Sequence, residues 1–146
     1  MIRLQAEAFD PGELLSRFCE GREVTGAVVS FTGIARADRG AETTLELEAY
    51  PGFTETEIEK LAAVAVDRFG LHDYLVCHRT GVIAPGEAIV FVATAAAHRR
   101  EAFEAADFVM DYLKSRAPFW KKERSADGER WVEPMARDLS DVARWE

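Results

Sequence analysis

HRREAFEAADFVMDYLKSRAPFWKKE, residues 98–123, contains the main helix of the chain and the bend that follows it. Apolar residues recur there at spacings of three and four, which predicts a helix with one face packed on a core. We expect that face to consist of Phe103, Ala106, Met110 and Leu113. Pro118 ends the helix, because the residue before a proline disfavours helical dihedral angles.

Two lysines flank this bend. Lys114 lies at the edge of the predicted apolar stripe, where a lysine either reaches water or keeps its amine in a half-buried pocket. Lys121 follows Pro118, in a segment that we expect to be extended. The pattern therefore predicts Lys114 and Lys121 on two sides of one bend, with Trp120 between them.

Further strands are predicted on both sides of this stretch, at residues 2–8, 24–33, 43–50, 74–79, 88–97 and 129–133. β-Branched and aromatic residues are frequent in 24–33, which we expect to be a central strand. Residues 88–97 are apolar almost throughout, as in a buried strand. Residues 43–50 alternate apolar with polar, which is typical of a half-exposed antiparallel strand.

Two more helices precede the main one. The first begins with Asp10 as its N-cap and Pro11 in its first turn, and ends near residue 21. The second opens with a predicted capping box between Thr54 and Glu57, and Gly70 ends it. The turn-rich segment 80–87 is expected to be irregular.

The order of these elements predicts one α+β domain over residues 1–146, with a mixed or antiparallel sheet. Short joins between strands argue against a doubly wound parallel sheet. From about residue 134 the tail is polar, apart from Trp145 near its end. We expect this tail to be loose or to dock on another surface.

Composition limits the classes of function. The chain has 146 residues, with 18 Lys and Arg against 26 Asp and Glu, which gives a net charge of −8. This acidic balance argues against nucleic acid or an anionic membrane as the main partner, although it leaves room for a local basic pocket. The N-terminus lacks the pattern of a signal peptide, so we expect a cytoplasmic protein.

Cysteine and histidine do not form a recognisable metal or nucleophile motif. Cys19 and Cys77 sit among apolar neighbours and are interpreted as buried, unreactive thiols. With only three histidines and no CxxC pair, no metal site and no cofactor are expected. His72 and His78, at or inside a predicted strand, are interpreted as structural.

Basic residues next to the ends of predicted elements suggest an anion site. His98 and Arg99 stand where a buried strand passes into the main helix, and helix N-termini attract anions. Arg36 follows another predicted strand. Each also fits an ordinary surface position. The sequence supplies cations that could converge with Lys114 and Lys121 on one anionic ligand, but it does not show that they meet.

Several longer motifs resemble the MoaE family, the large catalytic subunit of molybdopterin synthase. They are GAVVSFTGIAR (26–36), LELEAYPGFTETEI (45–58), HRTGVIAPGEAIVFVATAAAHRREAFEAADFVMDYLKSRAPFWKKE (78–123) and GERWVE (128–133). The sequence departs from the family at Phe53, where methionine is common, and at Ala96-Ala97, where a serine is usual. Neither departure removes a charged group.

The resemblance implies an α/β hammerhead-type fold with a small antiparallel β-subdomain. It implies a sulfurtransferase that converts cyclic pyranopterin monophosphate (precursor Z) into molybdopterin by installing two sulfurs as a dithiolene. The sulfur would arrive as a thiocarboxylate on the C-terminal Gly-Gly of a small ubiquitin-like partner, MoaD. Two large subunits would form a central homodimer, with one small subunit at each end of a heterotetramer.

Carried onto this sequence, the resemblance implies specific site residues. The catalytic lysines are Lys114 and Lys121. The substrate-binding positions are Ile34, Ala35, Arg36, His98, Arg99, Lys122 and Glu123. Because the partner brings the sulfur, the chain needs cations rather than a cysteine nucleophile, which agrees with the residues.

An alternative class of function uses the same basic residues without catalysis. The chain would then be a module that binds a phosphorylated small molecule, or a scaffold for a ubiquitin-like protein. Sulfur incorporation from a thiocarboxylated partner separates an enzyme from such a module.

Overall fold

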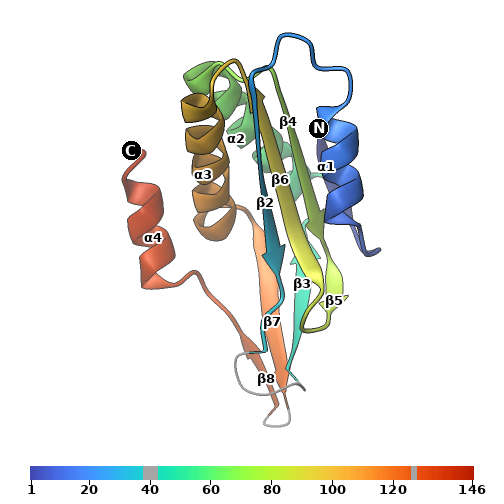
Figure 1. The fold of residues 1–146 in the computed structure, drawn as a ribbon. Helices are drawn as coiled ribbons and strands as arrows, with labels where there is room; N and C mark the ends of the chain where they lie inside the picture. The colour runs from blue at the N-terminus through green and yellow to red at the C-terminus, as the bar shows by residue number, and fades with distance from the viewer. Residues whose placement is uncertain (38–42, 126–127) are drawn as a thin grey trace.

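A computed structural model describes residues 1–37, 43–125 and 128–146, and Figure 1 shows its fold. Its larger sheet has the strand order β1-β4-β6-β2. These strands are β1 (Ile2–Gln5), β4 (Asp73–Arg79), β6 (Ala88–Ala96) and β2 (Ala27–Ile34). β1 pairs with β4 in parallel, and the other pairs are antiparallel. The expectation of a central strand at 24–33 is wrong, because β2 lies at the edge of the sheet.

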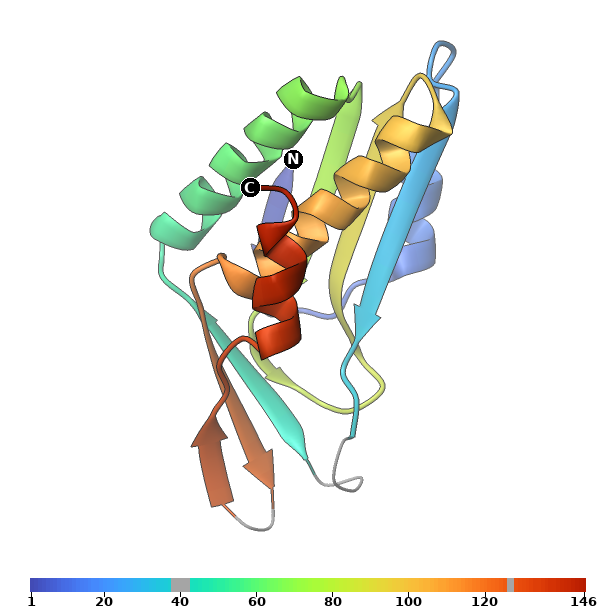
Figure 2. The ribbon, with the colours of Figure 1, turned by 90° about the vertical axis from the view of Figure 1, so that its left-hand side faces the viewer.

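Helices cover both faces of this sheet (Figure 2). α1 (Pro11–Cys19) packs Phe18 on one face, against Cys77 and Phe91. α2 (Phe53–Phe69) and α3 (Arg99–Ser115) share the other face, where Phe108 and Val92 belong to the main core. The strands therefore divide their side chains between two apolar layers, as the period of two requires.

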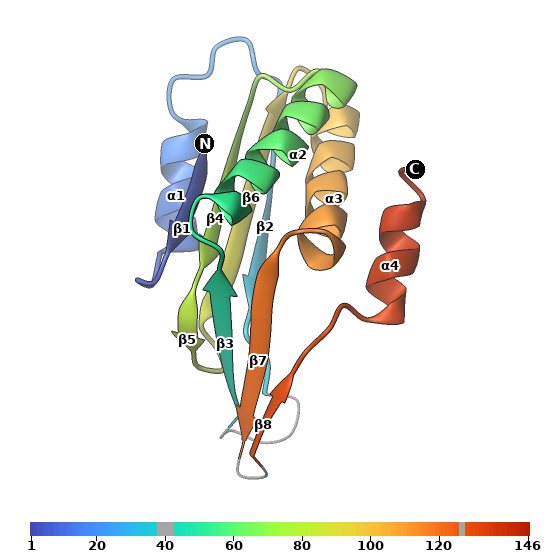
Figure 3. The same cartoon turned by 180° about the vertical axis from the view of Figure 1, so that it is seen from behind.

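A second, fully antiparallel sheet extends beyond one end of the first, with the order β5-β3-β7-β8 (Figure 3). Its strands are β5 (Gly81–Ile83), β3 (Thr44–Ala49), β7 (Phe119–Ser125) and β8 (Gly128–Trp131). The predicted α+β class with a small antiparallel subdomain is confirmed. The segment 80–87 was expected to be irregular, but it contains β5, which pairs with β3.

The buried face of α3 differs from the predicted one. Phe103 is 59% exposed, so its assignment to the apolar face is wrong. The buried residues are Ala102, Ala105, Ala106, Phe108, Val109 and Leu113. Three of these six are alanines, and such small side chains let α3 approach the sheet and α2 closely.

The start of α2 also differs from its prediction. α2 begins at Phe53 after Gly52, which has a φ of 78°, and no side chain caps it. Thr54 instead uses its hydroxyl in tertiary contacts: Oγ1 accepts from the Tyr50 N–H at 2.8 Å and donates to the Pro118 carbonyl at 2.7 Å. The predicted capping box between Thr54 and Glu57 is therefore wrong. In α1 the predicted Asp10 cap is confirmed.

The C-terminal tail docks on its own chain. α4 (Ala136–Ala143) packs on α3, and the Trp145 ring makes edge contacts with both Phe69 and Phe108. The Trp145 indole N–H donates to Asp111 at 2.6 Å. Of the two expected alternatives for the tail, docking is the one that the structure shows.

The two cysteines differ in exposure. Cys77 is buried, and burial raises the pKa of its thiol, which agrees with the predicted unreactive role. Cys19 is exposed at the last position of α1, so its predicted burial is wrong. Helix ends face solvent, and apolar neighbours in the sequence do not reveal this. In the described part of the chain, no helix is long and apolar enough to cross a membrane.

Candidate active site

The bend between α3 and β7 is held by hydrogen bonds within the last turn of α3 and by one from α2. The backbone N–H groups of Arg116 and Ala117 both donate to the Tyr112 carbonyl, at 2.7 and 3.0 Å, and close the last turn of α3. From α2, Thr54 binds the Pro118 carbonyl. Lys114 lies in the last turn of α3, and Lys121 lies in β7, so both lysines project from a fixed bend.

A buried histidine lies near both of these lysines. His78, in β4, is 8% exposed, and its ring stacks on Phe119 with centroids 4.3 Å apart. Phe119 and Lys121 share one face of β7, because they are two residues apart in a strand. The charges of Lys114 and Lys121 both act on the His78 ring. Both predicted catalytic lysines therefore lie near enough to the same buried ring for their charges to act on it.

The environment of His78 keeps its ring uncharged. Burial, followed by the nearby positive charges of Lys114 and Lys121, lowers its pKa from 6.5 to about 4, although a hydrogen bond to the Arg79 carbonyl opposes this shift. Sequence reasoning assigned His78 only a structural role. Its spacing gave no other signal, because Phe119 and Lys121 are remote in sequence and approach through the fold.

The segment 34–36 lies at the same end of the larger sheet. Ala35 donates its N–H to the Glu87 carbonyl at 2.8 Å and packs in a small core with Leu47 and Ile83. Leu47 is the cross-strand partner of Lys121. Ile34 is 60% exposed, and Arg36 is exposed beside it. These positions therefore lie near the strand that carries Lys121.

His98 and Arg99 lie at the opposite end of α3. His98 is the N-cap residue without a side-chain cap bond, and both side chains are exposed. Arg99 and Lys114 are 15 positions apart on this helix, which at 1.5 Å per residue is about 22 Å. Within one chain, the structure does not bring His98 and Arg99 to the lysine pair.

Lys122 and Glu123 take different faces of β7. Lys122 points away from Lys121, binds Glu129 at 2.9 Å and lies 4.9 Å from the Trp131 ring centre. Glu123 shares the face of Lys121 and accepts from Arg130 at 2.9 Å. Only Glu123 of these two is on the side of the lysine pair.

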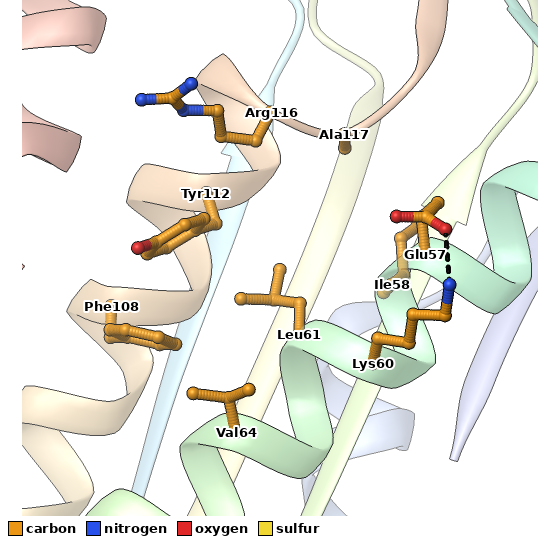
Figure 4. Close-up of a pocket in the computed structure, with 9 residues that line it drawn as sticks. All are labelled: Glu57, Ile58, Lys60, Leu61, Val64, Phe108, Tyr112, Arg116 and Ala117. Atoms are coloured by element: carbon orange, nitrogen blue, oxygen red, sulfur yellow. Dashed lines mark hydrogen bonds and ion pairs between the residues drawn. The ribbon is translucent and has the colours of Figure 1, made fainter. Parts of the chain in front are cut away.

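A cavity of about 300 Å³ opens elsewhere, between α2 and α3 (Figure 4). Its lining includes Leu61, Phe108 and Tyr112, with Arg116 at the rim. Lys114 and Lys121 are not among its lining residues, so this cavity is separate from the lysine pair.

The chemistry available at the bend is that of two amines beside an uncharged ring. Ammonium groups bind anions and stabilise oxyanions, and an amine near an acyl carbon is also a nucleophile. Over the described residues, no group of three or more His, Cys, Asp and Glu side chains is placed to hold a metal ion. The arrangement favours acyl or anionic chemistry carried by lysine.

Comparison with known proteins gives a consistent result. A family model described as MoaE protein matches residues 4–116. A molybdopterin synthase catalytic subunit from Caulobacter vibrioides is 64% identical over 146 residues, which cover 100% of this chain and 97% of that protein. A protein of the same name from Pseudomonas aeruginosa is 50% identical over 147 residues, and the match covers 99% of this chain and 98% of that protein.

Solved structures resemble the fold over almost the whole chain. A molybdopterin biosynthesis MoaE protein from Burkholderia ambifaria superposes with a TM-score of 0.85 at 43% identity, covering 99% of this chain and 97% of that one. Molybdopterin synthase from Staphylococcus aureus superposes with a TM-score of 0.79 at 28% identity, covering 89% and 95%.

Proposed function

The chain belongs to the MoaE family, and on that premise we propose that it is the catalytic subunit of a molybdopterin synthase. It transfers sulfur from the C-terminal thiocarboxylate of a small ubiquitin-like partner, MoaD, to cyclic pyranopterin monophosphate, which forms the dithiolene of molybdopterin. The observation that carries this proposal is that Lys114 and Lys121 flank one fixed bend and that the charges of both act on the buried, uncharged His78 ring.

The two lysines suit the steps of such a transfer. The partner's sulfur forms a bond to a substrate carbon as a carbon–oxygen bond of that carbon breaks, and the bond between that sulfur and the partner's acyl carbon must then break. Attack on the acyl carbon by water or by the Lys114 amine gives a tetrahedral oxyanion, which collapses with loss of the sulfur to the product. The Lys121 ammonium stabilises the oxyanion or returns the proton.

No cysteine is required on this chain, because the sulfur arrives on the partner. The described cysteines agree with that: burial raises the pKa of the Cys77 thiol, which makes it a poor nucleophile. Cys19 lies on α1, on the face of the larger sheet opposite to α3.

A second copy of the chain would complete the anion site. β2 is an edge strand, and its exposed residues Phe31 and Ile34 are apolar, as expected of a strand that pairs with another chain. The start of β2 lies near His98, and the end of β2 lies near Arg36. If two β2 strands pair antiparallel, the start of the strand in one copy lies next to its end in the other copy. His98 and Arg99 would then face the second copy's lysine pair and hold the substrate phosphate, within a homodimer that carries one MoaD at each end.

Reconstitution tests the proposed function. The purified chain is mixed with thiocarboxylated partner and precursor Z, and molybdopterin is measured as its fluorescent oxidation product. We expect product at up to one dithiolene for every two thiocarboxylates consumed. Binding of both components without sulfur incorporation would contradict the proposal and favour a non-catalytic module that binds a phosphorylated ligand or a ubiquitin-like protein.

A further inference from the structure

His78 occupies a place in β4 where an apolar residue would be ordinary. Residues of this strand alternate between the two core layers: Leu75 and Cys77 pack toward α1, and Val76 packs toward α2 and α3. The same alternation turns His78 toward α2 and α3, at the end of the strand where the two sheets meet. A polar ring that is buried there loses hydration, which costs free energy unless its nitrogens form hydrogen bonds.

The hydrogen bond of the ring fixes which nitrogen carries the proton. Nδ1 lies 2.8 Å from the Arg79 carbonyl oxygen. A carbonyl only accepts, so Nδ1 must be the N–H donor, and in the neutral ring Nε2 is left with its lone pair. Among the described residues, this is the one hydrogen bond of the His78 side chain, which leaves Nε2 available as an acceptor.

The donors at hand are ammonium groups. Phe119 stacks on the ring, and Lys121 follows on the same face of β7, about 7 Å along the strand. The charge of Lys114, in the last turn of α3, also acts on the ring. The other cation next in the chain, Arg79, points away from this face and binds the Ala6 carbonyl and Glu87.

We propose that His78 is a positioning residue for the lysine pair: its neutral ring accepts a hydrogen bond through Nε2 from one of the two ammonium groups and, with Phe119, forms the floor beneath them. This role rests on the proposed function, because it gives the lysines their orientation for acyl and sulfur transfer. His78 does not itself react with the substrate.

A neutral acceptor suits this role better than a carboxylate. A carboxylate would hold an ammonium group in place, but it would also cancel the positive charge that an oxyanion needs. A charged imidazolium would repel both lysines. The uncharged ring orients an ammonium group and leaves the charge of that group available, and burial keeps the ring uncharged near neutral pH.

Nitrogen-15 NMR of the histidine rings tests the geometry without any catalysis. In the intact protein at pH 7, we expect the His78 spectrum to show a protonated Nδ1 and an Nε2 that accepts a hydrogen bond. The Nε2 shift should move in Lys114→Ala or in Lys121→Ala, and it should stay in place in Lys60→Ala, a control lysine exposed on α2. A proton on Nε2, or an Nε2 shift that neither lysine variant moves, would overturn the proposal.

Turnover of two His78 variants tests the consequence. His78→Gln keeps an acceptor near the place of Nε2, whereas His78→Phe keeps the ring stack and removes the acceptor. We expect kcat of His78→Phe to fall by about tenfold or more with KM for the partner little changed, and His78→Gln to recover most of that loss. Equal losses in both variants, or no loss in His78→Phe, would show that the ring has only a structural role.

The two experiments separate this inference from the proposed function. If neither lysine is needed for sulfur transfer, the proposed function fails, but the NMR experiment still shows whether Nε2 accepts a hydrogen bond from a lysine. If the lysines are needed but Nε2 has no contact with them, the function survives and the role of His78 does not. Should His78→Phe fail to fold, the NMR measurement on the wild-type ring still decides.

Discussion

Lys121 and Lys122 are neighbours in sequence but face different surroundings. Lys121 shares its face of β7 with Phe119 and Glu123, toward His78, whereas Lys122 pairs with Glu129 over the Trp131 ring on the other face. The side-chain period of a strand causes this separation. Adjacent lysines in one motif can therefore have unequal roles.

Substitution of each lysine by alanine should show this difference. Loss of an oxyanion-stabilising group costs about 100- to 1000-fold in kcat, which we expect for Lys121→Ala. Lys122→Ala removes only a half-exposed ion pair and should stay within about threefold of the wild-type rate. The reconstituted reaction measures both rates, and equal losses in the two variants would contradict the assignment of faces.

The pKa of His78 gives the stability of the protein a dependence on acid pH. Above pH 6.5 the ring is neutral in both the folded and the unfolded chain and contributes nothing. Between pH 6.5 and about 4 the unfolded chain takes up a proton that the folded chain refuses, so the free energy of unfolding decreases, by at most roughly 3 kcal/mol.

Denaturant unfolding of the wild type and of His78→Phe at pH 7 and pH 4 measures this effect. The phenylalanine variant lacks the titrating ring, so its stability relative to the wild type should rise as the pH falls. Acidic residues titrate in both proteins and cancel in the difference. Parallel pH curves would show that the imidazole is not held neutral by the fold.

At the scale of elements, the bend between α3 and β7 depends on the first turn of α2. Thr54 is fully buried, and its hydroxyl bridges the Tyr50 N–H to the Pro118 carbonyl. One side chain thereby joins the end of β3, the start of α2 and the turn that separates the two lysines. Stability and catalysis should both respond to its loss.

Thr54→Val keeps the shape of the side chain and removes this bridge. We expect a loss of about 1–3 kcal/mol in the free energy of unfolding, because a part-buried N–H and a part-buried carbonyl lose their partner, and a lower kcat as the bend shifts. Thr56→Val is the matched control, since its hydroxyl makes an exposed bond within α2. If both variants had the same stability and kcat, Thr54 would not hold the bend.

Local sequence patterns predicted where helices and strands form better than they predicted which elements lie next to one another. The Asp10 cap, the proline stop and the alternation of 43–50 act within a few residues, so sequence alone placed α1, the end of α3 and β3. The edge position of β2 depends on which strands pair across the sheet, and β-branched composition does not report that. The role of Thr54 was missed for the same reason, because its acceptor is 64 residues away.

For the site, the lysine pair was predictable and the surroundings of the pair were not. A helix, a proline and a strand in succession place Lys114 and Lys121 around one bend. His78 reaches them only through the sheet. The distance between His98 and Lys114 follows from helix geometry alone, so convergence of the two on one ligand requires a second copy of the chain. Residues 38–42, between the predicted strands at 24–33 and 43–50, lie outside the described residues.

At the scale of the whole molecule, a site built from two copies can be tested by complementation. A chain with His98→Ala and Arg99→Ala should be inactive, and so should a chain with Lys114→Ala. If each site takes its cations from both copies, mixed dimers contain one intact and one doubly impaired site. Random mixing should then restore about a quarter of wild-type activity. No recovery after exchange of subunits would contradict a site shared between copies.

The central claim is that Lys114 takes part in the transfer of sulfur from the partner's thiocarboxylate. The most direct test is a single-turnover reaction of Lys114→Ala with thiocarboxylated MoaD and precursor Z, with partner binding measured in parallel. We predict partner affinity close to that of the wild type and no detectable molybdopterin. Near wild-type product formation by this variant would contradict the account.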